Sequence, residues 1–349
     1  MYKNIFQWKQ CLERRFKMAE KVAIVGSNSF SGSHLVDFFL KNTDWEIIGI
    51  SRSPEYPSLF LPYLYKKKRS PRFRFSRLNI NTQLPEIVQL LDREKPEIIV
   101  NFAAQGNVQY SWSNPMHWLT TNVIGISNLA FNLKNKDYLE RYIQISTPEI
   151  YGLCRSYQED SNCYNPSTPY AVSKVAGDLF LMAMFKKFRF PASFIRSVNV
   201  YGIHQQLYRI IPRTIIFLKK GLKIPLHSGG KAQRSFIHIE DVCDGIHRVI
   251  LKGRAGEAYH FSSGNTMEIR DLVKLICQKM NHNFEMSTEI TEDRADQDPM
   301  IDLDCSKAKE ELLWQPRIEL HSGIDEVIQW IDENWEEILE QPLEYIHKE

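Results

Sequence analysis

The chain has 349 residues, of which 43% are hydrophobic and 25% are charged, and its formal net charge is +2. This is ordinary globular composition, and the length suits about two domains, or one large α/β domain with an added lobe. The small net charge gives no reason to expect a nucleic acid partner. No apolar run in the sequence is long enough to cross a bilayer, so a membrane span is not expected either.

The cysteines are spread along the chain without a Cys-x-x-Cys pair. A chain of this length does not need a disulfide framework, so we expect reduced thiols, a cytoplasmic location and no bound metal. Residues 1–19 carry several basic side chains but lack the apolar core of a secretory signal. They are expected to form a loosely ordered N-terminal extension.

Strand and helix patterns alternate along the first two hundred residues. Strands are expected at Lys21–Val25, Glu46–Ile50, Phe73–Leu78, Glu97–Ala103 and Tyr142–Ser146, with a further one beginning at Ser193–Arg196. Helices are expected at Ser33–Leu40, Leu84–Glu94, Asn114–Leu133 and Tyr170–Phe185. This alternation predicts an α/β fold, a Rossmann-type doubly wound parallel sheet with helices on both faces.

The pattern is less regular after about residue 199, where helices are expected over Met267–Met280 and Gly323–Leu339. We expect an NAD(P)-binding Rossmann domain over residues 20–198, with residues 235–260 returning to it. Residues 199–234 and 261–340 are expected to form a smaller mixed α/β lobe that binds the substrate.

The first strand leads into the turn Gly26-Ser-Asn-Ser-Phe-Ser-Gly32. Gly26 permits a tight turn, and Gly32 lets the following helix pack close to the sheet. Backbone N–H groups at the helix N-terminus then face a pyrophosphate. The turn therefore predicts a dinucleotide site formed by Gly26, Asn28, Ser29, Phe30, Ser31 and Gly32.

The second strand ends without the carboxylate that commonly binds the ribose 2′-hydroxyl. Ser51 and Arg52 follow it instead, and a guanidinium with a neighbouring hydroxyl can hold a 2′-phosphate. We therefore expect NADP as the cofactor. NAD stays an alternative, because Glu55 is near enough in sequence to replace the missing acid.

Tyr170 and Lys174 are four residues apart in one predicted helix, so they share a face. A nearby ammonium should lower the pKa of Tyr170 and make the tyrosine a general base at neutral pH. Thr147 and Glu149 follow the strand Tyr142–Ser146, where residues of a parallel sheet face the ligand crevice. We expect all four side chains to be catalytic.

Together these segments resemble the extended short-chain dehydrogenase/reductase family, in its nucleotide-sugar branch, from about Lys21 to Ile331. Further landmarks are Asn101-Phe-Ala-Ala-Gln105, Asn199-Val-Tyr-Gly202, Gln233–Asp241 and Tyr259–Gly264. The turn Thr147-Pro-Glu149 is similar to that of the GDP-mannose and dTDP-glucose 4,6-dehydratases.

The resemblance implies a lyase acting on a nucleotide-diphosphate sugar. Tyr170, helped by Lys174 and Thr147, would take the proton of the sugar 4-hydroxyl while hydride leaves C4 for the nicotinamide. Glu149 would then remove the C5 proton, water would leave from C6, and hydride would return to C6. The product would be a 4-keto-6-deoxy sugar nucleotide, with the cofactor restored.

The resemblance also implies contacts beyond the catalytic residues. Gln105 and the backbone of Ala103 and Ala104 would lie along the cofactor, with Gln105 also facing the sugar. Asn79 and Ile80 would approach the adenine. Guanidinium groups bind phosphates in a bidentate manner, and the diphosphate or nucleoside would be held by Asn199, Arg209, Arg234 and Arg294. Family members usually dimerise through the two long helices, so a homodimer with a four-helix bundle is expected.

The sequence departs from the family pattern at three positions. Ser29 replaces the middle glycine of the turn, and Asn107 stands where a histidine is frequent. Pro148 stands where the dTDP-glucose type carries an acid that protonates the departing 6-hydroxyl. Because proline has no proton to give, Glu149 would have to return the proton that it removes, or the reaction is not a 4,6-dehydration.

Three other functions therefore stay open. UDP-glucuronate decarboxylases share the Thr-x-Glu turn, and C4 epimerases share every feature except Glu149. The alternative of another class is a catalytically silent NADP-binding module. The complete set of Thr147, Glu149, Tyr170 and Lys174 argues against such a module, because a sensor has no use for a base beside the site of oxidation.

Overall fold

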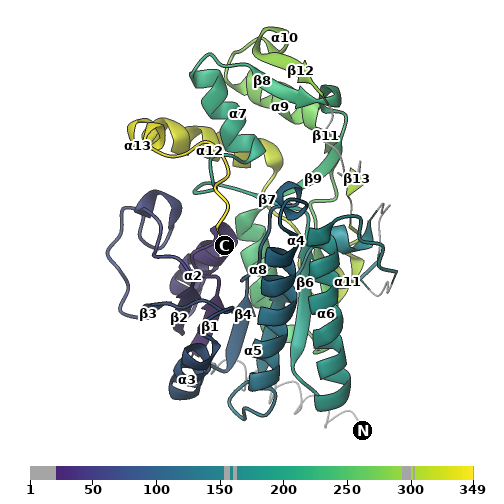
Figure 1. The fold of residues 1–349 in the computed structure, drawn as a ribbon. Helices are drawn as coiled ribbons and strands as arrows, with labels where there is room; N and C mark the ends of the chain where they lie inside the picture. The colour runs from purple at the N-terminus through teal and green to yellow at the C-terminus, as the bar shows by residue number, and fades with distance from the viewer. Residues whose placement is uncertain (1–20, 153–157, 160–162, 293–299, 302, 349) are drawn as a thin grey trace.

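The structure is a computed structural model that describes residues 21–152, 158–159, 163–292, 300–301 and 303–348, so the predicted extension 1–19 lies outside the described residues. Seven parallel strands form the main sheet in the order β10-β6-β5-β4-β1-β2-β3 (Figure 1). They are β1 (Lys21–Val25), β2 (Glu46–Ser51), β3 (Phe73–Arg77), β4 (Ile98–Asn101), β5 (Arg141–Ile145), β6 (Ala192–Ser197) and β10 (Ala258–Phe261). The predicted Rossmann-type sheet is confirmed.

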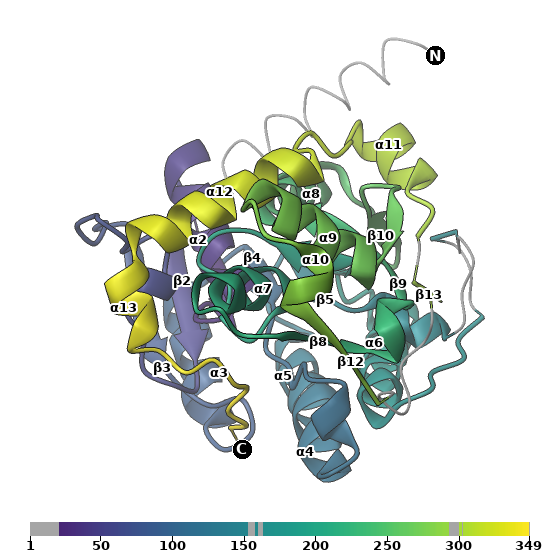
Figure 2. The same ribbon diagram turned by 90° about the horizontal axis from the view of Figure 1, so that it is seen from above.

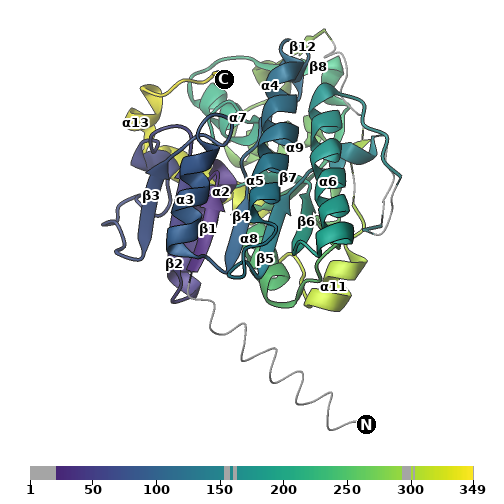
Figure 3. The ribbon, with the colours of Figure 1, turned by 60° about the horizontal axis from the view of Figure 1, so that its bottom comes forward.

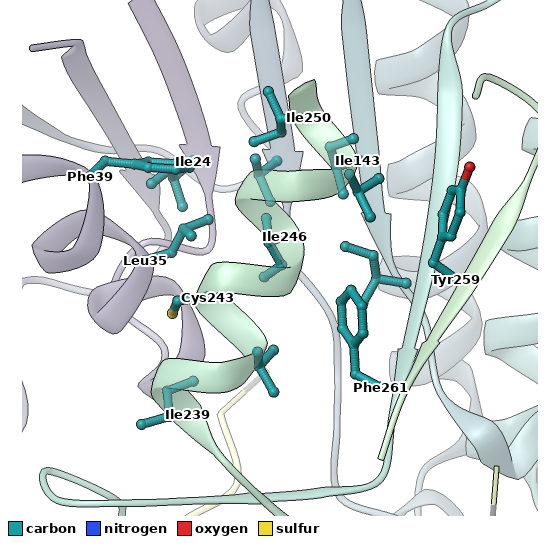
Figure 4. Close-up of a cluster of buried hydrophobic side chains, with 14 of the residues drawn as sticks. Ile24, Leu35, Phe39, Ile143, Ile239, Cys243, Ile246, Ile250, Tyr259 and Phe261 are labelled. Atoms are coloured by element: carbon teal, nitrogen blue, oxygen red, sulfur yellow. The ribbon is translucent and has the colours of Figure 1, made fainter. Parts of the chain in front are cut away.

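Helices cover both faces of this sheet. One face carries α2 (Phe30–Asn42) and α8 (Ile239–Lys252), and the other carries α3 (Leu84–Glu94), α5 (Ile126–Leu133) and α6 (Pro169–Phe188) (Figure 3). In the first of the two cores, Ile246 of α8 lies between Leu35 of α2 and Phe261 of β10 (Figure 4). Each such fully buried side chain contributes about 1.5–3 kcal/mol to folding.

The order of the strands places a crevice at the middle of the sheet. β1 lies between β2 and β4, and the chain proceeds outward from this centre in both directions. In open parallel sheets of this kind, ligands bind beyond the carboxyl ends of the strands at the point where the order reverses. The loops after β1, β2, β4 and β5 are therefore the ones that face a ligand.

The second lobe lies above the carboxyl edge of the main sheet in Figure 1. Its sheet joins β7 (Asn199–Tyr201), β9 (Gln233–His238), β11 (Thr266–Glu268) and β13 (Met300–Ile301), and β8 (Ile224–His227) pairs with β12 (Thr288–Thr291). Its helices are α7 (Ile210–Lys219), α9 (Ile269–Lys279), α10 (Phe284–Ser287), α12 (Leu320–Glu333) and α13 (Trp335–Leu339). Helix α11 (Ser306–Leu312) packs on α8 and β10 of the main sheet domain.

The long predicted helices differ in detail from the observed ones. The helix expected over 114–133 consists of α4 (Pro115–Leu119), a π-helical segment η3 (Thr120–Gly125) and α5. The helix expected from residue 267 begins at 269, because the preceding residues pair with β9 as β11. The last predicted helix is interrupted at Asn334, which separates α12 from α13.

Among the described cysteines, Cys163 is exposed, and Cys243, Cys277 and Cys305 are buried free thiols. Within the same part of the chain, no three His, Cys, Asp or Glu side chains gather as a metal site would require. None of the helices described there combines the length and the low polarity needed to cross a bilayer.

Candidate active site

The turn after β1 has the close packing that a phosphate-binding turn requires. Gly26 has a φ of 89°, and a Cβ atom there would lie 2.8 Å from the backbone nitrogen of Ala103. A Cβ atom at Gly32 would lie 2.3 Å from the carbonyl oxygen of Gly26. Neither position accepts a side chain, so both glycines have the structural roles predicted from the sequence.

Helix α2 begins directly at this turn. Ser29 is its N-cap, and the Ser29 Oγ atom accepts a hydrogen bond of 3.1 Å from the Gly32 N–H. Phe30 and Ser31 are the first two helical residues, and the N–H groups at these positions have no partner within a helix. Such N–H groups and the positive end of the helix dipole fit a pyrophosphate, so the cradle suits a dinucleotide.

Asn28 and Ser51 hold the loop after β2 against this turn. The Ser51 Oγ atom accepts a hydrogen bond of 3.0 Å from the Asn28 N–H. The Asn28 side chain accepts from the Tyr56 N–H at 3.0 Å and donates to the Pro54 carbonyl at 2.5 Å. These bonds use the polar atoms of both residues within the protein, so the two side chains shape the site by positioning the loop that carries Arg52.

Asn122 connects the loop after β4 with α6. Its Oδ1 atom accepts from the Gln105 N–H at 2.8 Å, and its Nδ2 atom donates to the Gln105 carbonyl at 3.0 Å and to Ser173 Oγ at 2.9 Å. A Cβ atom at Gly177 would lie 2.4 Å from the Asn122 carbonyl, which shows how closely α6 packs there. The residue lies in the π-helical segment η3, a geometry frequent at functional sites.

Asn122 was not among the residues singled out from the sequence. The only signal available there was an asparagine in the interior of a helix, where its side chain competes with the backbone for hydrogen bonds.

The other residues predicted along the cofactor make contacts within their own loops or are buried. Ala103 donates its N–H to Asn101 Oδ1 at 3.1 Å, the Oδ1 atom of Asn79 accepts from the Asn81 N–H at 2.9 Å, and Ile80 is buried.

The four predicted catalytic residues come from two adjacent segments. Thr147 caps the short helix η4 (Pro148–Tyr151) after β5, and its Oγ1 atom accepts from the Glu149 N–H at 3.4 Å. Tyr170 is the second residue of α6, and Lys174 lies one turn later on the same helix. The Thr147 hydroxyl is hydrogen-bonded to the Tyr170 phenol, and the Glu149 carboxylate is close enough to raise the pKa of that phenol.

The expected effect of Lys174 on Tyr170 is not observed. Burial raises the pKa of Tyr170 well above its usual value, Glu149 raises it further, and the hydrogen bond from Thr147 and the charge of Arg209 lower it. The Lys174 Nζ atom instead donates to the Ile145 carbonyl at 2.7 Å. Desolvation therefore dominates, and it keeps the pKa of Tyr170 above its ordinary value.

A buried polar network lies next to Lys174. Asp178 and Arg196 are each 1% exposed, and the Asp178 Oδ2 atom lies 3.5 Å from the Arg196 Nη2 atom and accepts from Ser146 Oγ at 2.5 Å. Arg196 also donates to the Tyr151 hydroxyl. Burial lowers the pKa of Lys174, and the charge of Asp178 opposes that change. Asp178 is thus placed between two buried cations.

Sequence reasoning missed this network, although signals for it were present. Asp178 continues the helical face of Tyr170 and Lys174 at a spacing of four residues. Arg196 interrupts an apolar strand, and a buried guanidinium requires a partner.

We expect Asp178→Asn to lower the free energy of unfolding by about 3 kcal/mol, because it leaves the buried Arg196 without a counter-charge. Urea unfolding followed by circular dichroism measures this. The matched control is Asp137→Asn at an exposed position, which should change stability by less than about 0.5 kcal/mol. A similar small effect for Asp178→Asn would show that the ion pair contributes little.

The residues predicted for the substrate lie in the second lobe. Arg209 is exposed at the N-cap of α7, and its charge acts on Tyr170, so it faces the catalytic residues. Asn199 donates from Nδ2 to the Ser235 carbonyl at 3.2 Å, and Arg234 donates from Nη1 to the Gln233 carbonyl at 2.7 Å. The structure thus brings Arg209 to the catalytic group, while Arg294 lies outside the described residues.

The chain matches known proteins along most of its length. A family model described as GDP-mannose 4,6 dehydratase matches residues 24–327. The dTDP-glucose 4,6-dehydratase of Haemophilus influenzae is 28% identical over 330 residues, which are 88% of this chain and 97% of that protein. The dTDP-glucose 4,6-dehydratase of Streptomyces antibioticus is 30% identical over 249 residues, which are 70% of this chain and 73% of that protein.

Solved structures give the same result. The dTDP-glucose 4,6-dehydratase from Streptomyces venezuelae, with NAD and TYD bound, has a TM-score of 0.82 at 28% identity and covers 90% of this chain and 97% of its own. A UDP-glucuronic acid 4-epimerase from Bacillus cereus has a TM-score of 0.81 at 24% identity, covering 90% of this chain and 99% of its own, and shows the fold alone.

These matches confirm the predicted resemblance and the prediction of an enzyme of the hydro-lyase class. The family match spans both lobes and includes every described residue of the candidate site. The chain belongs to the GDP-mannose 4,6 dehydratase family, in the nucleotide-sugar 4,6-dehydratase branch of the extended short-chain dehydrogenases/reductases.

Proposed function

We propose that the protein converts a nucleotide-diphosphate hexose into its 4-keto-6-deoxy derivative. The observation that carries this proposal is the gathering of Thr147, Glu149 and Tyr170 at the carboxyl end of β5 and the start of α6. A tyrosine with a hydroxyl partner suffices as the base for oxidation of a sugar hydroxyl, with the nicotinamide as the hydride acceptor. A carboxylate beside it is useful when a second proton, next to the new ketone, must be removed.

Each side chain has a role in this reaction. The nicotinamide, when bound, accepts the hydride of C4 and later donates it to C6. Tyr170 accepts the proton of the 4-hydroxyl, and Thr147 holds that hydroxyl in place. The ketone at C4 acidifies the C5–H bond, Glu149 removes this proton, and the 6-hydroxyl departs.

Proton balance follows from the same residues. Pro148 is buried and has no proton to give, so Glu149 returns its captured proton to the departing hydroxyl, which leaves as water. C5 takes up one proton from solvent and Tyr170 releases to solvent the proton that it accepted, so these two protons balance. The net change is the loss of one water from the sugar, and the cofactor is unchanged.

A panel of GDP-, UDP-, dTDP- and CDP-hexoses tests the proposal, with products identified by mass spectrometry. Loss of one water from one member, without added oxidant, supports the dehydratase and identifies the nucleotide. Loss of carbon dioxide from a uronate would assign a decarboxylase instead, and an isomer of unchanged mass would assign an epimerase. Firm NADP binding without any reaction would favour a binding module.

We propose NADP as the cofactor. Arg52 follows β2 at the position where other dinucleotide sites carry an acid. The nearest carboxylate, that of Glu55, accepts hydrogen bonds from Tyr63 Oη at 2.9 Å and from Arg69 Nη2 at 2.5 Å, so it is held within its own loop. These contacts favour a 2′-phosphate over a ribose hydroxyl at Arg52.

We therefore expect NADP⁺ to bind roughly tenfold more tightly than NAD⁺, the gain of about one charge-assisted contact. Isothermal titration calorimetry measures both dissociation constants. Arg52→Ala should remove the preference for NADP⁺ over NAD⁺, because the 2′-phosphate loses its charged partner. Equal affinities of the unaltered protein for the two cofactors would contradict the assignment.

We further propose that the protein is a homodimer. α5 and α6 lie side by side on one face of the molecule (Figure 3). Large exposed apolar side chains mark interaction surfaces, and η3, α5 and α6 together expose Ile124, Phe131, Val172, Leu179 and Phe188. A second copy packed there completes a four-helix bundle. Free thiols such as Cys243, Cys277 and Cys305 are typical of a reducing compartment, so we place the protein in the cytoplasm.

A further inference from the structure

Residues 342–348, here called the strap, follow α13 and return toward the main sheet. Figure 1 shows the strap in yellow, turning back from α13 and ending at the mark C, to the left of α4; Figure 2 shows the same course from above. Its side chains alternate between half-buried (Leu343, Tyr345, His347) and exposed (Glu344, Ile346, Lys348). This alternation is that of an extended segment with one face against the protein.

The strap ends at side chains from two loops at the carboxyl edge of the main sheet. The carbonyl oxygen of Lys348 accepts hydrogen bonds from Arg52 Nη2 at 3.0 Å and from Gln105 Nε2 at 2.8 Å. Arg52 follows β2, Gln105 lies in the loop after β4, and β1 is the strand between β2 and β4. The Lys348 carbonyl therefore links the two loops on either side of β1.

Aromatic contacts hold the strap in the crevice. The His347 ring is stacked on the Trp118 ring, with centroids 5.2 Å apart and planes 4° apart, and its Nε2 atom lies 3.0 Å from Nδ1 of His117. The Lys348 Nζ atom donates to the Tyr56 hydroxyl at 3.0 Å and lies over the Tyr56 ring. The strap thus contacts side chains on both sides of the crevice.

The middle of the strap reaches the substrate side. The Tyr345 ring lies between those of Tyr110 and Tyr208, with centroids 4.9 Å and 5.3 Å away. Tyr208 precedes Arg209, which faces the catalytic Tyr170. One segment therefore spans the places proposed for the dinucleotide and for the sugar nucleotide.

We propose that the strap is an autoinhibitory contact that occupies the dinucleotide site and must leave before the cofactor binds. The proposal rests on the proposed function, because it takes Arg52 and Gln105 as cofactor contacts. A carbonyl oxygen and a phosphate oxygen are both acceptors for these donors, and the two cannot occupy the same place. The apparent affinity for the cofactor is then reduced by the fraction of molecules whose strap is displaced.

The test compares three full-length proteins by calorimetric titration with NADP⁺ and NAD⁺. The double variant Tyr345→Ala/His347→Ala removes the ring contacts that hold the strap. Ile346→Ala is the matched control, because this side chain lies in the strap but is 60% exposed. If the strap occupies the cofactor site in about nine-tenths of the molecules, the double variant should bind the cofactor roughly tenfold more tightly. The affinity of the control variant should equal that of the unaltered protein.

A second measurement needs no variant. Addition of NADP⁺ to the unaltered protein should speed amide hydrogen exchange in residues 343–348, because the strap is displaced. Slower exchange there, or weaker binding by the double variant, would overturn the proposal and identify the strap as a clasp over bound cofactor. Equal affinities of all three proteins would overturn the strap's role alone. Absence of binding in all three would overturn the cofactor assignment, and the strap's role with it.

Discussion

Tyr170→Phe is expected to lower turnover at least about a hundredfold while cofactor affinity stays the same. The substitution removes only the phenolic oxygen that accepts the proton of the sugar 4-hydroxyl. The ring keeps its half-buried position at the start of α6, so the fold and the crevice are retained. Product formation is measured by mass spectrometry with the substrate found in the panel, and cofactor affinity by calorimetry.

A matched control is Tyr138→Phe, since the Tyr138 hydroxyl bonds Asp92 on α3 and has no part in the proposed reaction. Its turnover should equal that of the unaltered protein.

Burial and Glu149 raise the pKa of Tyr170, so the fraction of molecules with a deprotonated Tyr170 increases as the pH rises. The rate should therefore increase toward alkaline pH, and this increase should be absent in Tyr170→Phe. Near-normal turnover in that variant would remove the tyrosine from the mechanism.

Glu149→Gln is expected to separate oxidation from elimination. The variant keeps Tyr170 and Thr147, so the first step still transfers hydride from the substrate. The amide cannot remove the C5 proton, and release of product should fall by roughly a hundredfold or more. In a single turnover, the absorbance of reduced nicotinamide should rise and then persist, where the unaltered enzyme shows only a brief rise.

Glu140→Gln is the control for this experiment, because Glu140 is an exposed carboxylate before β5 and lies outside the site. It should follow the time course of the unaltered enzyme. If Glu149→Gln also releases product at the normal rate, the C5 proton leaves by another route. If it fails even to reduce the cofactor, Glu149 acts in the first step, and the assignment of roles must be revised.

The main sheet was predictable because its strands are short apolar runs between turn signals. β1 and α3 have the bounds expected from the sequence, and β2 and β3 differ by one residue. In the second lobe, by contrast, local pattern was a poor guide. The strands β7, β11 and β13 are two or three residues long, and pairing with β9 rather than side-chain periodicity determines them.

The candidate site was predictable where a motif dictates geometry. Gly26 and Gly32 stand where a side chain would collide with backbone, so the sequence alone implies their role. The charge balance around Tyr170 was not predictable. It depends on burial and on the direction of the Lys174 ammonium toward a strand carbonyl, and neither is encoded in the spacing of the two residues.

The strap was invisible in the sequence for a related reason. Tyr345 and His347 follow the last predicted helix in a stretch without regular pattern. Their partners, Tyr110 and Trp118, lie more than two hundred positions earlier in the chain. Contacts between such distant segments form only when the two lobes have folded and packed together, so local sequence pattern does not predict them.

The position of β10 determines when the cofactor-binding domain can fold during synthesis. This strand, residues 258–261, pairs with β6 at the edge of the main sheet, and α8 just before it covers a central core. A ribosome must therefore translate about three quarters of the chain before the cofactor-binding half can close its hydrophobic interior. Until then, a nascent chain exposes β6 as an unprotected edge that invites pairing with other chains.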